Sequence, residues 1–304
     1  MEPFLLTAIY FIAMVLVGWF FVANFVSVVL HRCVAHHAIK LPRWWMYSVM
    51  SVCNLCFLYV NPRTWVSDHR NHHAHSDTDK DPDKQPNQSY MDWLIYTILH
   101  NPSAQEPEIQ KMTGDPIFKS LPFRFFASRP GWILCELSCM TMAYVFFRSI
   151  AWSVAFYVTL RVLGIAVLTF QGYLAHGSNL GYGYRTYAVP DNSANITNPF
   201  ALFLTAGECL QNNHHAKPRF ATHSHQKSEK DVGFVLVRML ETVGIAEVPK
   251  RSLPDYLTKE TAKVASVVET AVAEEQVTTS EETETVTPVV ATSEEAPETK
   301  VANP

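Results

Sequence analysis

FLLTAIYFIAMVLVGWFFVANFVSVVL occupies residues 4–30, and none of its 27 side chains is charged. A membrane-spanning helix needs roughly 20 apolar residues, so this stretch predicts one tilted span and is too short for two. The stretch runs directly into HRCVAHH at residues 31–37. Histidines are rare at membrane depth unless they serve a function. The junction therefore predicts a functional site at a membrane surface.

Three further apolar runs follow, at residues 44–60, 132–148 and 150–170. The last two predict a helical hairpin that returns the chain to the same side of the membrane. Arg161 lies inside its second arm and is expected to face protein or water rather than lipid. We expect 44–60 not to cross, because crossing would place the histidines before and after it on opposite sides.

Charge divides the chain into two parts. Only 17% of the 304 residues are charged, against about 25% in soluble proteins. From residue 259 onward there are ten Glu and three Lys, so the net charge of −4 hides a positive remainder of +3. We expect one membrane domain over 1–257 and a disordered acidic tail over 258–304. The predicted fold is an all-α integral membrane protein whose spans are capped by a helical domain.

Histidines gather in clusters at the ends of these apolar runs. The eight candidate metal ligands are His31, His36, His69, His72, His73, His176, His214 and His215. Neutral imidazole is the commonest metal ligand among side chains. Adjacent histidines on a helix point about 100° apart, so each adjacent pair can serve two metals. His31 and His36 are about 140° apart on an ideal helix and converge only if the helix ends or bends.

Polar residues near the histidines are the candidates for supporting roles. Carboxylate and amide oxygens can accept the ring N–H of a ligating histidine and fix its tautomer; the candidates are Asp68, Asp77, Asp79, Asp81, Glu208 and Asn212. Basic residues could receive a phosphate-bearing headgroup or contact anionic lipid; they are Arg32, Arg70, Lys217 and Arg219. His223 and His225 lie in the polar stretch RFATHSHQKSEK and are expected to be solvated.

Four segments carry a resemblance to a known family. They are HRCVAHHAIKLP (31–42), WVSDHRNHHAHSDTDKDPD (65–83), GYRTYAVPDNSANI (183–196) and TAGECLQNNHHAKP (205–218). In this order they resemble the membrane fatty acid desaturases, and their spacing is similar to the bacterial Δ9 acyl-CoA and acyl-lipid branch. The resemblance implies that the eight histidines hold two irons. It also implies a reaction that uses O₂ and two electrons to remove two hydrogens from neighbouring carbons of an acyl chain.

The same resemblance implies the partners. The substrate would be a long-chain fatty acyl group linked to coenzyme A or to a phospholipid, within membrane lipid, and no nucleic acid is expected. The sequence has neither a CxxCH motif nor a ferredoxin-like cysteine series, so electrons would come from a separate ferredoxin, rubredoxin or cytochrome with its reductase. Trp65 and aromatic residues of the first and fourth apolar runs are expected to line an acyl tunnel; interfacial anchoring is the alternative for Trp65.

Two positions depart from the family pattern. Gln211 stands where the third histidine box usually begins with histidine, and Gly172 stands where an Asn is often found. Gln211 could ligate through its carbonyl, hold a water, or leave one iron with an open site. A lipid hydroxylase or ketolase, and a non-catalytic metal-binding membrane protein, remain the alternatives. Basic residues beside the histidines predict a cytoplasmic site on a bacterial inner membrane.

Overall fold

The computed structural model describes residues 3–83, 89–99, 106–177 and 182–257. The predicted disordered tail at 258–304 lies outside the described residues. The helices, in chain order, are α1 (Pro3–Asn24), the π-helix η1 (Phe25–Ala35), α2 (Arg43–Cys56), α3 (Pro62–His75), α4 (Tyr90–Leu99), α5 (Glu106–Met112), the 3₁₀ helix η2 (Pro116–Lys119), α6 (Leu121–Phe126), α7 (Arg129–Phe147), α8 (Ile150–His176), α9 (Pro199–Leu204), α10 (Gln211–Ala216), α11 (Val232–Thr242) and the 3₁₀ helix η3 (Lys250–Ser252). Within the described ranges there is no strand, only isolated bridges such as Lys40 with Glu247. The predicted all-helical class is confirmed.

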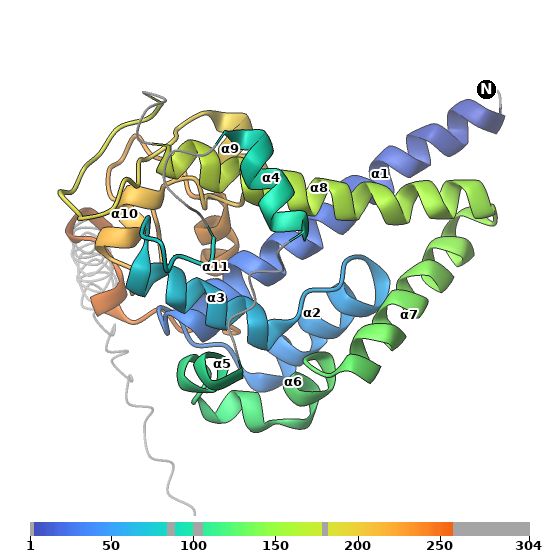
Figure 1. The fold of residues 1–304 in the computed structure, drawn as a ribbon, viewed down its shortest axis with the longest axis horizontal. Helices are drawn as coiled ribbons and strands as arrows, with labels where there is room; N and C mark the ends of the chain where they lie inside the picture. The colour runs from blue at the N-terminus through green and yellow to red at the C-terminus, as the bar shows by residue number, and fades with distance from the viewer. Residues whose placement is uncertain (1–2, 84–88, 100–105, 178–181, 258–304) are drawn as a thin grey trace, which may run out of the picture. The chain divides into compact units, whose positions relative to one another are not determined.

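In the part of the chain that the structure describes, three helical segments are long and apolar enough to cross a membrane: Phe4–Ala35, Arg129–Phe147 and Ile150–His176. Helices α7 and α8 form the predicted hairpin, and α8 also packs against α1 (Figure 1). Large apolar side chains along these helices are exposed, as expected for contact with lipid. The short helices α3, α9, α10 and α11 lie at one end of the long ones (Figure 1); we call this region the cap.

Arg161 on α8 faces protein, as the sequence predicted. Its guanidinium forms an ion pair with Glu136 on α7 and lies 3.3 Å from the ring centroid of Tyr157. The Tyr157 hydroxyl donates to the same carboxylate at 2.7 Å. This ion pair gives each of the two half-buried charges a partner and joins the two arms of the hairpin.

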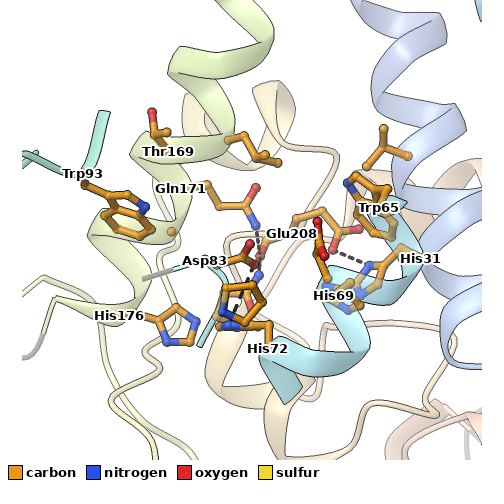
Figure 2. Close-up of a pocket in the computed structure, with 16 residues that line it drawn as sticks. His31, Trp65, His69, His72, Asp83, Trp93, Thr169, Gln171, His176 and Glu208 are labelled. Carbon is orange, nitrogen blue, oxygen red and sulfur yellow. Dashed lines mark hydrogen bonds and ion pairs between the residues drawn. The ribbon is translucent and has the colours of Figure 1, made fainter. Parts of the chain in front are cut away.

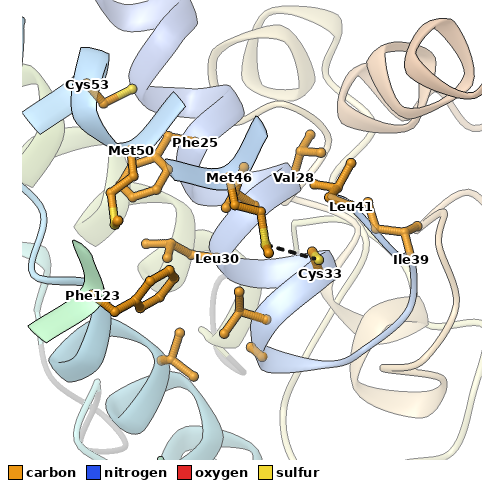
Figure 3. Close-up of a cluster of buried hydrophobic side chains, with 14 of the residues drawn as sticks. Phe25, Val28, Leu30, Cys33, Ile39, Leu41, Met46, Met50, Cys53 and Phe123 are labelled. Atoms are coloured by element: carbon orange, nitrogen blue, oxygen red, sulfur yellow. Dashed lines mark hydrogen bonds between the residues drawn. The ribbon is translucent and has the colours of Figure 1, made fainter. Parts of the chain in front are cut away.

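Helix α2 packs against α1 and α7. Its 14 residues extend about 21 Å, less than the roughly 30 Å of a bilayer core. Met46 and Met50 are buried in the main hydrophobic core beside Phe25 and Phe123 (Figure 3). Each fully buried side chain of this kind contributes about 1.5–3 kcal/mol. The length and packing of α2 support the expectation that 44–60 does not cross, which stays a prediction.

The helix that begins as α1 changes geometry before it reaches the histidines. From Phe25 to Ala35 it is a π-helix, whose hydrogen bonds span five residues. The last of them joins the amide of His36 to the carbonyl of His31 at 3.1 Å. Because a π-turn brings residues five apart onto one side, the two imidazole centroids lie 4.9 Å apart. The predicted end or bend between these histidines is therefore a π-helix that ends at Ala35.

Candidate metal centre

Five imidazoles from three elements converge in one cluster, which we call cluster one. Its members are His31 and His36 from the π-helix and its C-cap, His69 and His73 from α3, and His214 from α10. Their Nε2 atoms approach one another: 2.7 Å for His36 with His69 and for His73 with His214, and 3.0 Å for His31 with His214. Histidines 183 residues apart in the sequence thus share one small volume.

Three more imidazoles form cluster two: His72 from α3, His176 at the end of α8 and His215 from α10. The Nε2 atoms of His72 and His215 are 3.2 Å apart, and the His176 ring lies about 5 Å from both of the others. The adjacent pairs His72–His73 and His214–His215 each contribute one ring to each cluster. This is the divergence that the helical rotation predicted, and it places two possible cation sites side by side.

Carboxylates lie behind four of these imidazoles, each close to Nδ1. The contacts are Glu208 with His31 at 2.7 Å, Asp81 with His72 at 2.9 Å, Asp77 with His176 at 3.0 Å and Asp191 with His215 at 2.9 Å. An Nδ1–H donated to a carboxylate leaves the Nε2 lone pair free for a metal. All three imidazoles of cluster two have such a carboxylate. Asp191 was not predicted, because it lies in an irregular loop far in sequence from any histidine.

The protonation of the two clusters differs. Burial, together with the neighbouring imidazoles, holds the pKa of His36, His69, His73 and His214 well below the ordinary histidine value. Burial also lowers the pKa of His72, but the hydrogen bond to Asp81 and the nearby carboxylate charges outweigh it and raise that pKa to about 9. These four imidazoles of cluster one are therefore neutral at pH 7, whereas a cation that binds His72 in cluster two must displace a proton from this residue.

The donor set fits a metal such as iron, zinc, copper or nickel, which imidazole suits. In cluster one, several Nε2 lone pairs converge, and a hydrogen bond can satisfy them only two at a time. A cation among them would satisfy all of them together. The Nδ1 atom of His214 is buried without a hydrogen-bond partner among the described residues, so no carboxylate or carbonyl of these residues holds the ring in place. Both clusters therefore have the residues that a metal would need.

A third group of possible ligands, His31, Glu208 and His223, also lies close together. A positive charge lies directly beside this group, because Arg32 donates to Glu208 Oε1 at 2.9 Å and lies 3.2 Å from His223 Nδ1. A cation is unfavourable there. His223 is 1% exposed, so the expectation that it is solvated was wrong. The neighbours of His223 in the sequence are polar, but His223 itself is buried beside Arg32.

The expectation that Arg32 could receive a headgroup or contact anionic lipid is wrong. The side chain is 1% exposed and donates to both oxygens of Asp231, at 2.9 and 3.0 Å, as well as to Glu208. Two glycines leave room for this network. A Cβ at Gly233 would lie 2.6 Å from the Arg32 guanidinium, and one at Gly207, with φ of +86°, would lie 2.5 Å from Asp231.

The Arg70 side chain likewise forms its hydrogen bonds and its ion pair within the protein. Its guanidinium donates to the carbonyls of Ala35, Met112 and Val34 at 2.6–3.0 Å and forms a 2.6 Å ion pair with Asp115. These bonds tie α3 to the end of the π-helix, so Arg70 does not serve a headgroup as predicted. Lys217 and Arg219 are exposed, and their headgroup role stays a prediction.

A cavity of about 200 Å³ opens beside the two clusters. Figure 2 shows Trp93 and Trp65 at its opposite sides, with His176 and His72 between them. Trp65 lines the cavity, and its ring stacks on His69 with 5.1 Å between the centroids; its place in an acyl tunnel stays a prediction. The lining residues of the first and fourth apolar runs are Val26, Leu168 and Thr169, which are not the aromatic residues that the sequence suggested.

The remaining predicted residues lie near the clusters in different roles. Asp68 lines the cavity. Asn212 accepts from the amides of Thr186 and Tyr187 at 2.7 and 2.8 Å, so it holds a backbone segment rather than an imidazole. Gln211 and Gly172 both line the cavity. The Gln211 amide donates to the Glu208 carbonyl at 2.7 Å.

Replacing Asp191 with asparagine should weaken cluster two without changing its shape. Burial raises the pKa of Asp191, but the hydrogen bond from His215 and the backbone outweigh it, so the group stays ionised. Loss of such a partner typically costs about 10–100-fold in metal affinity or activity. Metal analysis of the purified Asp191→Asn protein measures the loss. Glu247→Gln, at an exposed ion pair with Lys40, is the control, and equal metal affinity in both variants would contradict the role of Asp191.

Comparison with known proteins agrees with this architecture. The family model for fatty acid desaturases matches residues 6–232, more than half of the chain. The sn-1 stearoyl-lipid 9-desaturase of Anabaena variabilis is 32% identical over 71% of this chain and 75% of that protein. The sn-2 palmitoyl-lipid 9-desaturase of Nostoc sp. (strain 36) is 26% identical over 81% and 83%, respectively.

A relative with another named specificity is also similar. The chloroplastic palmitoyl-monogalactosyldiacylglycerol delta-7 desaturase of Arabidopsis thaliana is 29% identical over 75% of this chain, which covers 59% of that protein. The family match, the long apolar helices and the histidine clusters lead to one conclusion. The chain belongs to the fatty acid desaturase family and is an oxidoreductase that acts on fatty acyl groups.

Proposed function

We propose that this protein is a di-iron, O₂-dependent acyl desaturase that introduces a double bond at Δ9 of a long-chain acyl group carried by coenzyme A or a lipid. The observation that carries the proposal is the pair of histidine clusters, with five and three imidazoles. The 9-desaturase names of two relatives support the position of the double bond. In the proposed reaction, –CH₂–CH₂– with O₂, two electrons and two protons gives –CH=CH– and two waters.

The histidines and the carboxylates beside them would have different roles in this reaction. Cluster one would hold one iron and cluster two the other, and these irons would supply the activation of O₂ and the oxidising power that an unactivated C–H bond demands. Glu208, Asp81, Asp77 and Asp191 would keep Nδ1 of their histidines protonated and the rings oriented. The role of these carboxylates would be to hold protons at stated atoms rather than to take them from substrate.

The cavity would hold the reacting part of the acyl chain. Its walls combine Trp65, Trp93, Val26 and Leu168 with the imidazoles, so apolar surface lies directly beside the clusters. Excluding water would direct the oxidant to the substrate rather than to solvent. An apolar chain would reach this place along the long helices without crossing an aqueous phase.

Membrane orientation and electron supply complete the proposal. We place the cap and its histidines in the cytoplasm and the α7–α8 turn on the other side, because basic residues concentrate beside the histidines. The membrane would be a bacterial inner membrane. A separate ferredoxin, rubredoxin or cytochrome with its reductase would deliver the two electrons to the cytoplasmic face.

The test is product analysis by mass spectrometry after expression in a host that lacks unsaturated acyl chains, with an electron donor present. The expected product is a lipid acyl chain lighter by two hydrogens, with its double bond at carbon nine. A double bond elsewhere would correct the regiochemistry alone. A gain of oxygen would instead identify a hydroxylase or ketolase. Unchanged lipids with an active donor would favour a non-catalytic metal-binding protein.

A further inference from the structure

The two clusters differ in how many imidazoles they provide, and the reason can be traced to particular helix positions. On α3, His69 and His73 are four residues apart, share one face, and both belong to cluster one. In cluster two, the positions four residues before His215 and His176 can be compared with this pair. Gln211 lies four residues before His215, and Gly172 lies four residues before His176. Neither position carries an imidazole or a carboxylate.

Packing explains why these two positions are not equivalent. A Cβ at Gly172 would lie 2.5 Å from the ring of Trp93, which is 3% exposed. The indole on α4 therefore takes the space that a side chain at 172 would need. Gln211 has a side chain of ligand length, is 7% exposed, and donates its amide to the Glu208 carbonyl at 2.7 Å. Position 211 therefore accommodates a long polar side chain, whereas any side chain at position 172 would collide with Trp93.

Both positions line the same cavity as His72 and His176. The open side of cluster two is therefore the side that faces the cavity. Three imidazoles leave half the positions of a six-coordinate metal to other ligands, whereas five leave one. A site with open positions exchanges ligands, whereas a filled site is closed. Displacement by a chelator begins at an open position, so openness makes a bound metal replaceable.

We infer that the two metals of this protein are held unequally: the metal of cluster two is open toward the cavity and exchanges, while the metal of cluster one is retained. The inference rests on the proposed two-metal function. Asp81, Asp77 and Asp191 contact Nδ1 of the three imidazoles of cluster two, and none of these carboxylates lines the cavity. Asp83 does line the cavity, but its carboxylate also lies on the Nδ1 side of His72, at 3.8 Å. Gln211 lies on this open side without supplying an imidazole, and it can be replaced by histidine to test the inference.

The experiment measures metal release from the full-length protein loaded with iron(II) in detergent. Bipyridine is added under anaerobic conditions, and the iron remaining on the protein is counted with time. We expect one iron per chain to be released and the other to remain on the protein. The Gln211→His protein should release its first iron on the order of 10-fold more slowly. Gln226→His makes the same substitution at an exposed position and should behave like the unaltered protein.

A second variant keeps the test decisive if histidine at 211 disturbs folding. His176→Ala should lose the exchanging iron and keep the retained one. Release of both irons at one rate, or unchanged release from Gln211→His, would overturn the inference. These results are separate from product analysis, because the protein could form an unsaturated product with two equally held irons. Unequal release without any product would leave the inference standing and remove the proposed function.

Discussion

Replacing His36 with alanine is expected to abolish desaturation, with a loss greater than the roughly 100-fold typical of residues that only support a ligand. The Nε2 atom of His36 lies 2.7 Å from that of His69 inside cluster one, so alanine would remove one of five converging donors. We expect the metal of cluster one to be lost as well. Metal analysis and product formation on the same preparation measure the two effects.

The adjacent residue provides a control that differs by one position. His37 has a side chain that is 61% exposed and pairs with Asp115 at 2.9 Å, and it belongs to neither cluster. An exposed pair of this kind contributes about 0–1 kcal/mol, so His37→Ala should retain both metals and its activity. Equal loss in both variants would point to general damage at the end of the π-helix. Full metal content in His36→Ala would remove His36 from the centre.

The division of histidines between clusters was predictable because it follows from local geometry. Neighbours on a helix differ by about 100°, and this rotation alone separates His72 from His73 and His214 from His215. The approach of His31 to His36 was only partly predictable. The sequence required a departure from α-helical geometry there, but local residue preferences do not distinguish a π-turn from a bend or a helix end. The choice depends on packing with α2, α3 and α11.

The errors share a physical origin in long-range pairing. Arg32 resembles a surface residue in sequence, since it follows a membrane span where basic side chains usually meet headgroups. Its partners Glu208 and Asp231 are 176 and 199 residues away. Asp191 was missed for a similar reason, because an aspartate in an irregular loop has no periodic signal. Charge and polarity identify residues that need a partner, and only the fold determines which partner they find.

Replacing Arg32 with methionine should give the largest loss of stability of the substitutions considered. It would leave Asp231 and Glu208, which are buried, without their shared cation. Breaking a buried ion pair by removing one partner typically costs about 3–5 kcal/mol. A lower thermal unfolding midpoint in detergent is expected even without metal. The loss would also release Glu208 from the position in which it holds His31, so metal retention by cluster one should fall with stability.

Two further substitutions distinguish this network from a headgroup role. Arg32→Lys keeps the charge but loses the planar fork whose two terminal nitrogens donate to Asp231 and to Glu208, so its stability should lie between that of Arg32→Met and that of the unaltered protein. Arg251→Met removes an exposed arginine and should stay within about 0.5 kcal/mol. A headgroup residue would instead raise KM for the acyl substrate and leave unfolding unchanged. That outcome for Arg32→Met would restore the role predicted from sequence, because a charge that can be removed without cost cannot be the one that holds two buried carboxylates.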